Sequence, residues 1–323
     1  MSVFRTTTWR TWAVWAENIA LAFIISLTFY ITLPVKTEKQ LSIPSGTTSK
    51  TIISQLNTRG YDVGFIDAFI LSKMGKNSRG QINQGELNFK KPYLDRIDFL
   101  YKLTKAKIPL VKITLIPGET TEIFLGLVAK KLDINKTKLL DAYQTQAKYP
   151  EAAIAADTYL APKKMNESNL IKFLLKSSER NYKKLAMEQY GDYNQTQWHR
   201  VLTIASIIQK EAANNKEMPL VASVIYNRLK KNMRLQMDGT LNYGKYSHIK
   251  VTPERIKTDL STFNTYKHKG LPKSPIGSVN TTAIRAVLNP AKTNYLYFMR
   301  NKDGIHDFTD TFKKHRKNIK KTR

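Results

Sequence analysis

QWHRVLTIASIIQKEA, residues 197–212, is the stretch that decides the fold of the larger part of this chain. Its apolar side chains recur at helical spacing, which predicts a long helix with one buried face. Ile204, Ile207 and Ile208 lie on that face, and Glu211 continues the same stripe. The helix therefore ends with a carboxylate at a position where a core side chain is expected.

A second apolar helix is expected directly after the first. NNKEMPLVASVIYNRLKKN, residues 214–232, breaks at two asparagines and restarts near Pro219, a residue favoured in the first turn of a helix. An ionised Glu211 at the junction is costly unless it is paired, so it either finds a cation or binds a proton more readily. One interpretation is a salt bridge with Arg228 or Arg234. The other is a general acid whose pKa burial raises to roughly 6.

The composition restricts the partners that this chain can have. At 323 residues it is long enough for more than one folded unit. Its formal net charge of +28 predicts attraction to an anion, which can be nucleic acid, a membrane surface or an acidic polymer. The absence of cysteine excludes disulfides and thiolate nucleophiles, so a zinc site would have only histidines and carboxylates as ligands.

The N-terminus predicts one membrane span. Residues 19–35 carry no charge, and together with residues 11–18 they approach the roughly 20 residues that cross a bilayer. The flanking residues that suit a headgroup region and an inward-facing positive end are Trp9, Trp12, Trp15, Arg5 and Arg10. We expect a cytoplasmic segment over 1–11, a transmembrane helix over 12–35 and the rest outside the cytoplasm. A cleaved signal peptide is the alternative, but residues 30–40 contain no small-residue cleavage site.

One pattern occurs twice after the span. SIPSGTTSKTIISQL begins at Ser42 and TLIPGETTEIFLGLV begins at Thr114, and both predict a strand, a Pro/Gly turn, a Thr helix cap and an amphipathic helix. Two copies are too few for a solenoid, which needs at least about three repeats. Either the two copies are alike only because strand–turn–helix units tend to use the same residue types, or they form a small α+β module that binds a polymer. We expect the module over 36–132 and a further domain over 133–323.

Polar and aromatic loops follow the two apolar helices. Residues 233–244 and 261–280 are rich in Tyr, Asn, Thr, Gly and Pro. Sugars offer hydroxyls to amides and apolar ring faces to aromatics, so this pattern is typical of a carbohydrate-binding cleft beside one candidate acid, Glu211. Asp157, in a loop before Pro162, is a candidate second acid, although a lone loop Asp more often caps a helix.

Six segments occur in an order that matches a known family. They are ASIIQKEA, VASVIYNRL, MRLQMDGTLNYG, FNTYKHKGLPKSPI, LNPAKTNYLYF and GIHDFTDTFKKH. Together they resemble the MltG (YceG-like) endolytic murein transglycosylases, strongly over 198–315 and weakly elsewhere. The resemblance implies an α+β chain with a single N-terminal transmembrane helix, a LysM-like module where the repeated pattern lies, and a mixed α/β catalytic domain.

The resemblance also implies an activity and a site. Such enzymes cleave the bond between N-acetylmuramic acid and N-acetylglucosamine in nascent peptidoglycan strands, leave 1,6-anhydro-muramoyl ends and thereby limit strand length. Glu211 matches the catalytic acid, whereas Gln209 and Gly239 stand where the family has Glu and Pro. His306 and His315 match family positions. The residues that the resemblance assigns to shaping the cleft and binding sugar are Gln236, Asp238, Asn264, Thr265 and Tyr266.

The implied partners are peptidoglycan glycan strands, the membrane and peptidoglycan synthases, with no nucleic acid, metal or cofactor. The implied location is the inner (cytoplasmic) membrane, with a single pass and the catalytic domain in the periplasm or otherwise outside the cytoplasm. Two alternative functions remain open. One is a muramidase-type hydrolase that uses Glu211 with Asp238 or Asp157, and the other is a non-catalytic membrane-tethered protein that binds a polymer through the basic residues 313–323.

Overall fold

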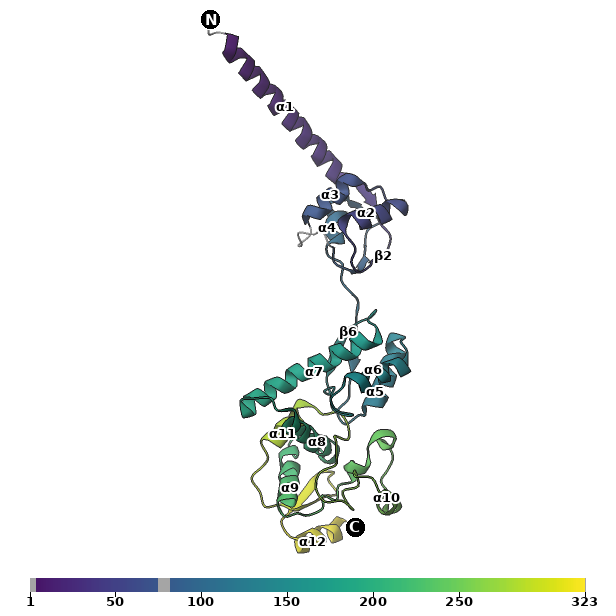
Figure 1. Ribbon diagram of the computed structural model, residues 1–323, viewed down its shortest axis with the longest axis vertical. Helices are drawn as coiled ribbons and strands as arrows, with labels where there is room; N and C mark the ends of the chain where they lie inside the picture. The colour runs from purple at the N-terminus through teal and green to yellow at the C-terminus, as the bar shows by residue number, and fades with distance from the viewer. Residues whose placement is uncertain (1–3, 75–81, 323) are drawn as a thin grey trace. The chain divides into compact units, whose positions relative to one another are not determined.

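The computed structural model describes residues 4–74 and 82–322, and the chain forms two compact units, Met1–Pro109 and Leu110–Arg323 (Figure 1). This division falls earlier than the domain boundary that the sequence suggested after residue 132. The reason is that β5 (Leu110–Thr114) pairs antiparallel with β6 (Thr158–Pro162), which joins the second copy of the repeated pattern to the larger unit. The two copies therefore belong to different units.

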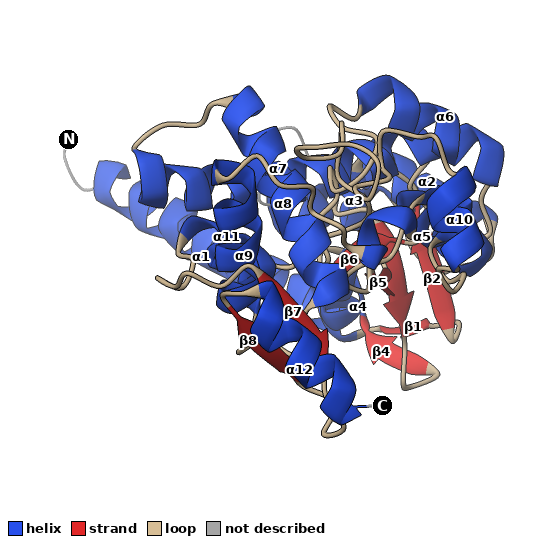
Figure 2. Cartoon of the chain, turned by 90° about the horizontal axis from the view of Figure 1, so that it is seen from below, coloured by secondary structure: helices blue, strands red, loops and turns tan. Residues whose placement is uncertain are grey.

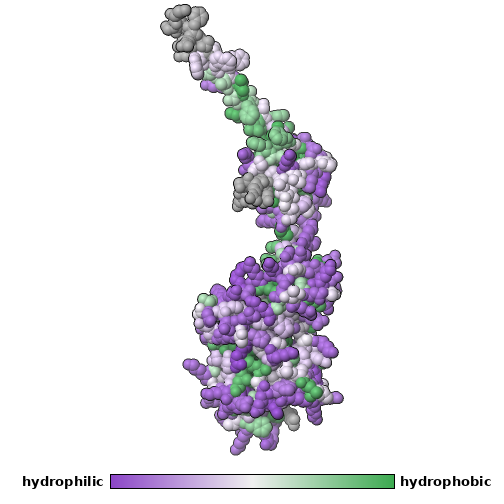
Figure 3. Space-filling model, in the orientation of Figure 1, coloured by the Kyte–Doolittle hydropathy of each residue, from purple (hydrophilic) through white to green (hydrophobic). Residues whose placement is uncertain are grey.

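The first unit begins with α1 (Phe4–Thr32), of which Thr11–Thr32 is long and apolar enough to cross a membrane. Hydrophobic residues run along this helix in Figure 3, and none of its apolar window is buried. The helix ends three residues before the expected position 35, because Pro34 opens β1 (Pro34–Lys36), which pairs with β4 (Tyr93–Asp95). One such helix is compatible with a single-pass anchor.

A small α+β module follows α1 in the same unit. Its elements are β2 (Gln40–Ile43), α2 (Ser49–Thr58), α3 (Phe65–Met74), β3 (Gly85–Asn88) and α4 (Arg96–Leu103). The strands β2 and β3 pair antiparallel, and the helices bury apolar side chains such as Leu56 and Phe99 in one core. The LysM-like character that the family resemblance implies for this module stays a prediction.

Both copies of the repeated pattern form the predicted strand, turn and helix, but their helix caps differ. Thr48 caps α2, since its side chain accepts the N–H of the residue three positions on at 3.2 Å. In the second copy α5 (Thr121–Leu132) is capped by Glu151, whose Oε2 accepts from the N–H of Thr121 at 2.9 Å and from its Oγ1 at 2.8 Å. A distant carboxylate has taken the place of the expected Thr.

The second unit is built around the helix that the opening stretch predicts. Its first part contains α6 (Lys136–Gln146) and α7 (Glu167–Tyr190), and its centre contains α8 (Gln195–Glu211), α9 (Met218–Lys230) and α11 (Thr281–Leu288). The helix α8 packs against both α9 and α11. Its buried residues include the predicted isoleucines of the apolar stripe, so the two-helix prediction is confirmed.

Loops and short elements complete the second unit. They are the single turns η1 (Asp238–Leu241) and η2 (Gly244–Tyr246), then α10 (Pro253–Thr258), β7 (Tyr297–Arg300), β8 (His306–Thr309) and α12 (Phe312–Thr322). The basic helix α12 packs on the β7–β8 hairpin, which lies beside it in Figure 2. Within the described residues all strands pair as two-stranded antiparallel sheets, so the fold is α+β.

A buried ionic network closes the first unit. The Oδ2 of the fully buried Asp67 accepts hydrogen bonds from the Tyr30 hydroxyl at 2.9 Å, the Gly64 N–H at 2.7 Å and Arg96 Nη1 at 2.8 Å. Arg96 Nη2 also reaches the exposed Asp62 at 2.8 Å. Buried charges are costly unless paired, so this network determines where the end of α1 meets α3 and α4.

We predict that Asp67→Ala destabilises the first unit by about 3 kcal/mol, because it leaves the Arg96 guanidinium buried without its main partner. The matched control is Asp62→Ala, which removes the exposed partner of the same arginine and costs less than about 1 kcal/mol. Thermal unfolding of the full chain in detergent, followed by protease sensitivity of the first unit, measures both. Equal losses for the two variants would contradict the role of Asp67.

Candidate active site

Glu211 is the last residue of α8, and its carboxyl is held against a backbone amide. Oε1 accepts a hydrogen bond from the Gly239 N–H at 2.6 Å. Burial raises the pKa of Glu211 to about 7, and the neighbouring charge of Asp238 also raises it, while the Gly239 N–H and Arg228 act in the opposite direction. The negative end of the helix dipole further disfavours the ionised form. The carboxyl therefore retains a proton near neutral pH, as a general acid requires.

Gly239 can approach the carboxyl because it has no side chain. A Cβ at this position would lie 2.8 Å from Glu211 Oε1 and 3.0 Å from Lys210 Cβ, closer than side chains tolerate. A proline, which the family resemblance implies at this position, has no N–H to donate. The hydrogen bond to Glu211 thus depends on the glycine that this chain has here.

The structure does not favour the salt-bridge interpretation of Glu211. Arg228 is buried, but its Nε donates to the Leu296 carbonyl at 2.6 Å and its Nη1 to the Leu235 carbonyl. Arg234 is exposed. Over residues 4–74 and 82–322, Glu211 forms no ion pair, so Arg228 acts on it only through longer-range attraction.

Asp238 and Tyr266 lie beside the candidate acid. The Tyr266 hydroxyl donates to Asp238 Oδ1 at 2.6 Å. Burial and the Asp238 carboxylate both raise the pKa of Tyr266, so the phenol keeps its proton and this hydrogen bond. The exposed Asp238 is one residue from the Gly239 amide that contacts Glu211. The structure therefore brings together Glu211, Asp238 and Tyr266, three residues that the sequence singled out.

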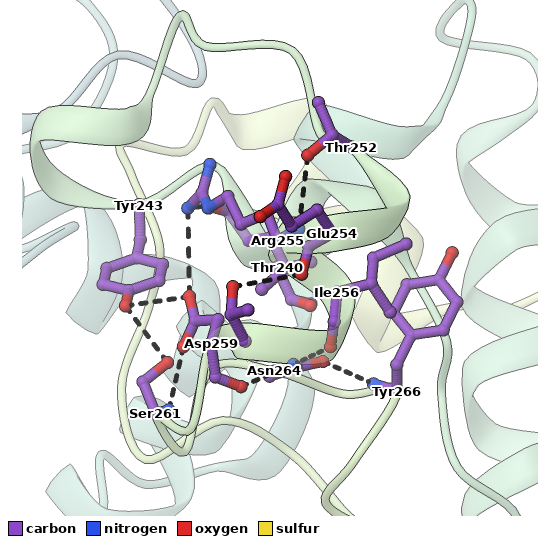
Figure 4. Close-up of polar contacts among 12 residues, drawn as sticks. Thr240, Tyr243, Thr252, Glu254, Arg255, Ile256, Asp259, Ser261, Asn264 and Tyr266 are labelled. Carbon is purple, nitrogen blue, oxygen red and sulfur yellow. Dashed lines mark hydrogen bonds and ion pairs between the residues drawn. The ribbon is translucent and has the colours of Figure 1, made fainter.

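Asn264 is not available for direct sugar binding. Its side chain is 0% exposed, and its amide nitrogen donates to the carbonyls of Ile256 at 2.9 Å and Asp259 at 2.8 Å (Figure 4). Its Oδ1 accepts the Tyr266 N–H at 3.1 Å. The expected contact between Asn264 and substrate is thus corrected to a supporting role that holds the Tyr266 loop.

Thr265 is likewise buried, and it holds the segment that carries Gln236 and Met237. Its Oγ1 accepts the Met237 N–H at 3.1 Å and lies 2.9 Å from Thr240 Oγ1. Its carbonyl accepts the N–H of Gln236 at 3.1 Å. Gln236 itself is exposed and has a φ of 48°, a strained left-handed conformation for a side chain of its size. Of the five expected sugar-binding residues, Gln236, Asp238 and Tyr266 reach the surface.

Sequence reasoning missed charged residues that lie around Lys210. Its Nζ donates to the Asn242 carbonyl at 2.5 Å and to Ser247 Oγ at 3.1 Å, and burial lowers its pKa. Burial also raises the pKa of Glu151 to about 7, although Thr121 and Lys210 oppose this shift. The sequence feature that could have pointed to these charged residues is Glu119, the acid in the second repeated turn. Its Oε2 lies 2.9 Å from His248 Nε2.

Asp157 and His306 have other roles in the structure. The Oδ1 of Asp157 accepts the Thr158 N–H at 2.6 Å, so this exposed residue caps the start of β6. His306 Nδ1 lies 2.7 Å from Glu217 Oε2, and its backbone N–H donates to Glu217 Oε1 at 2.9 Å. This pair ties the β7–β8 hairpin to the loop after α8. His315 stacks on Tyr297, with ring centroids 5.3 Å apart.

Aromatic side chains around Tyr243 pack together in the loops that Figure 4 shows. The Tyr243 hydroxyl donates to Ser261 Oγ at 3.1 Å, and its ring stacks on Phe263 with centroids 4.2 Å apart. Arg255 lies over the ring of Tyr246, with the guanidinium carbon 3.9 Å from the centroid. These contacts order the loop between η1 and the Tyr266 segment.

Comparison with known proteins identifies the family. The YceG-like family matches residues 41–321 of this chain. This chain belongs to the YceG-like family. The crystal structure of a yceG-like protein from Listeria monocytogenes superposes with a TM-score of 0.55 and 26% identity, over 87% of this chain and 99% of that chain.

Two family relatives carry a functional name. The endolytic murein transglycosylase of Bacillus subtilis (strain 168) is 42% identical over 125 residues, which are 38% of this chain and 34% of that protein. The protein of the same name from Streptococcus pneumoniae serotype 2 (strain D39 / NCTC 7466) is 36% identical over 106 residues, 31% of this chain and 19% of that protein. The matched part thus spans about a third or less of these relatives' length.

We predict that Glu211→Gln stabilises the protein above neutral pH. The folded pKa of about 7 exceeds the usual 4.5, so the folded state holds a proton that the unfolded state has lost, and stability falls as pH rises between these values. Gln carries no charge and keeps an acceptor for Gly239, so the variant gains about 1 to 3 kcal/mol at about pH 8 and almost nothing at about pH 4.5.

Glu217→Gln is the matched control for this measurement. Burial would raise the pKa of Glu217, but the hydrogen bonds from His306 outweigh it and hold the pKa below its usual range. This variant therefore loses stability at the same alkaline pH. Thermal unfolding across pH measures both, and a Glu211→Gln variant no more stable than the parent at alkaline pH would show that Glu211 is not destabilised by ionisation.

Proposed function

We propose that this protein is an endolytic lytic transglycosylase of peptidoglycan. It cleaves the bond between N-acetylmuramic acid and N-acetylglucosamine within nascent strands, leaves 1,6-anhydro-muramoyl ends and limits strand length. The observation that carries the proposal is the Glu211 carboxyl, which keeps a proton near neutral pH beside exposed polar groups. Family membership and the relatives named endolytic murein transglycosylase support it.

In the first step Glu211 acts as a general acid. Its proton passes to the glycosidic oxygen between the two sugars as the bond from that oxygen to C1 of the muramoyl residue breaks. Positive charge develops on the ring, and the carboxylate left on Glu211 stabilises it. A pKa of about 7 suits this transfer, because a group that is partly protonated at working pH is also a strong enough acid to donate.

In the second step the same carboxylate acts as a base. The muramoyl O6 attacks C1, and its proton returns to Glu211, so the enzyme recovers its starting protonation state and no water is consumed. The Gly239 N–H contributes here, since a hydrogen bond to Oε1 stabilises the ionised form that exists between the two steps. One carboxyl therefore suffices for the complete reaction.

Asp238 and Tyr266 support Glu211 in the proposed reaction. The Asp238 charge raises the pKa of Glu211, and the Tyr266 hydroxyl orients Asp238 through its 2.6 Å hydrogen bond. An exposed carboxylate at this place also favours the positive charge of the breaking bond. We propose that Asp238, Tyr266 and Gln236 contact the sugars, and that Asn264 and Thr265 hold these three in place.

The hydrolase alternative would need a second carboxylate as nucleophile or base. Of the two carboxylates considered, Asp238 is close enough to influence Glu211, whereas Asp157 accepts a hydrogen bond at the start of β6. The non-catalytic alternative would rely on α12, whose six Lys and Arg residues lie on a helix with no buried side chain. The three alternatives differ in product, which is an anhydro end, a reducing end or none.

We further propose that α1 anchors the protein in the cytoplasmic membrane, with the second unit outside the cytoplasm. The chain, whose net charge is +28, is then attracted to the carboxylates of uncrosslinked peptidoglycan and the phosphates of the outer leaflet. Peptidoglycan synthases, which produce the uncrosslinked strands, are the proposed protein partners.

The product of the reaction tests the proposal. We expect the full chain in detergent to convert uncrosslinked glycan strands into fragments one water lighter than hydrolysed ones, by mass spectrometry. Glu211→Gln lowers this rate by about a thousandfold, since it removes the acid and the base. Asp238→Asn lowers it by roughly tenfold through weaker charge stabilisation and keeps the anhydro end. Reducing ends would favour the hydrolase, and the absence of cleavage would favour the binding protein.

The Gly239 hydrogen bond predicts a shift in the pH profile. Because Glu211 must donate a proton, kcat/KM falls as pH rises through about 7. Gly239→Pro removes the N–H that stabilises the carboxylate, so this decline moves upward by about one pH unit relative to the parent protein. An unchanged profile would show that the hydrogen bond does not tune the acid.

A further inference from the structure

The helix α3 exposes an apolar face that the core of the first unit does not use. Phe65 is 85% exposed, Ile66 47% and Phe69 58%, whereas the core of the unit buries side chains such as Leu56 and Phe99. The buried side of α3 instead carries Asp67 and Leu71. Contiguous exposed apolar residues mark a surface that binds something apolar.

This face begins beside the end of the candidate membrane span. Asp67, in the first turn of α3, accepts from the hydroxyl of Tyr30 in the last turns of α1 at 2.9 Å. The carbonyl of Leu33, just after α1, accepts the Arg96 N–H at 3.0 Å, and the Arg96 guanidinium lies 4.5 Å from the Tyr30 ring centroid. In Figure 1, α3 lies beside the end of α1, and β2 lies on the side of the module away from it.

The length of α1 places this junction at the membrane surface. The 22 residues Thr11–Thr32 extend about 33 Å at about 1.5 Å per residue, close to the roughly 30 Å of the hydrocarbon core. Tyr30 then lies at headgroup depth, where tyrosine is favoured. Because Tyr30 contacts Asp67 directly, the first turn of α3 lies at the same depth.

We infer that α3 lies in the lipid surface, with Phe65, Ile66 and Phe69 inserted between the headgroups of the outer leaflet. The inference rests on the proposed membrane anchor. Lys73 continues the exposed face, and its Nζ lies 5.5 Å from the Phe69 ring centroid, within reach of lipid phosphate. The module is then held against the membrane at two points, the span and α3, which stops it from pivoting about the end of α1.

A glycan is the other occupant to consider for this surface. Phe65 and Phe69 also line a groove of about 750 Å³ between α2 and α3, whose opposite wall carries polar residues such as Lys50 and Asn57. Ile66, however, does not line this groove. The apolar face therefore extends beyond the groove, and this favours lipid as its occupant.

Depth measurements with spin labels test the inference, because the chain has no cysteine and each new one is unique. The labelled variants of the full chain are Ile66→Cys on α3, Ile25→Cys in the span and Ser42→Cys on the exposed side of β2. In liposomes of equal parts phosphatidylethanolamine and phosphatidylglycerol, collisions with oxygen report lipid and collisions with a water-soluble nickel chelate report water.

We expect labels at Ile25 and Ile66 to collide more with oxygen and the label at Ser42 to collide more with nickel. Adding Phe65→Ser and Phe69→Ser to Ile66→Cys moves its label into water, without unfolding the module, since both rings are exposed.

Three other outcomes overturn the inference. A lipid-exposed label at Ile25 with a water-exposed label at Ile66 leaves the anchor intact and rejects the insertion of α3. A water-exposed label at Ile25 rejects the anchor and the inference together. A label at Ile66 that is shielded from nickel only when glycan strands are added assigns the face to sugar.

Discussion

The burial of one carboxyl at the end of α8 is the constraint on which the proposed chemistry depends. The apolar stripe of α8 continues into Glu211, so the packing of the helix against α9 and α11 leaves this side chain half-buried and poorly solvated. The η1 turn then brings the Gly239 N–H to 2.6 Å from Oε1. Burial raises the pKa and the amide limits the rise, and the balance leaves the carboxyl able to give and to recover a proton.

Local patterns allowed much of this arrangement to be predicted from the sequence. Helical spacing predicted α8 and α9, and Pro/Gly turns followed by Thr predicted the two strand–turn–helix units, because these signals depend on neighbouring residues. The two compact units divide before residue 110, earlier than the boundary expected after residue 132, since the pairing of β5 with β6 joins segments far apart in the chain. The burial of Asn264 and Thr265 was missed for the same reason, because their partners lie in other loops.

Carboxylates in this protein show how position sets protonation. Glu211 and Glu151 are both half-buried, and loss of solvation raises the pKa of each, yet Glu151 accepts two bonds from Thr121 and caps α5, a structural role. Glu217 is held below its usual pKa by His306, and Asp67 is paired with Arg96. Glu211 differs from Glu151 in its neighbours, because Asp238 and Tyr266, two residues that the sequence singled out, lie beside it.

A direct titration of Glu211 tests the central claim most sharply. Carbon-13 NMR of the glutamate side-chain carboxyls in the full chain, with Glu211→Gln and Glu151→Gln to assign signals, measures each proton separately. We predict that the signal lost in Glu211→Gln titrates near pH 7. A signal that titrates near the ordinary value of 4.5 would show that α8 and Gly239 do not hold a proton on this carboxyl, and would remove the basis for its role as an acid.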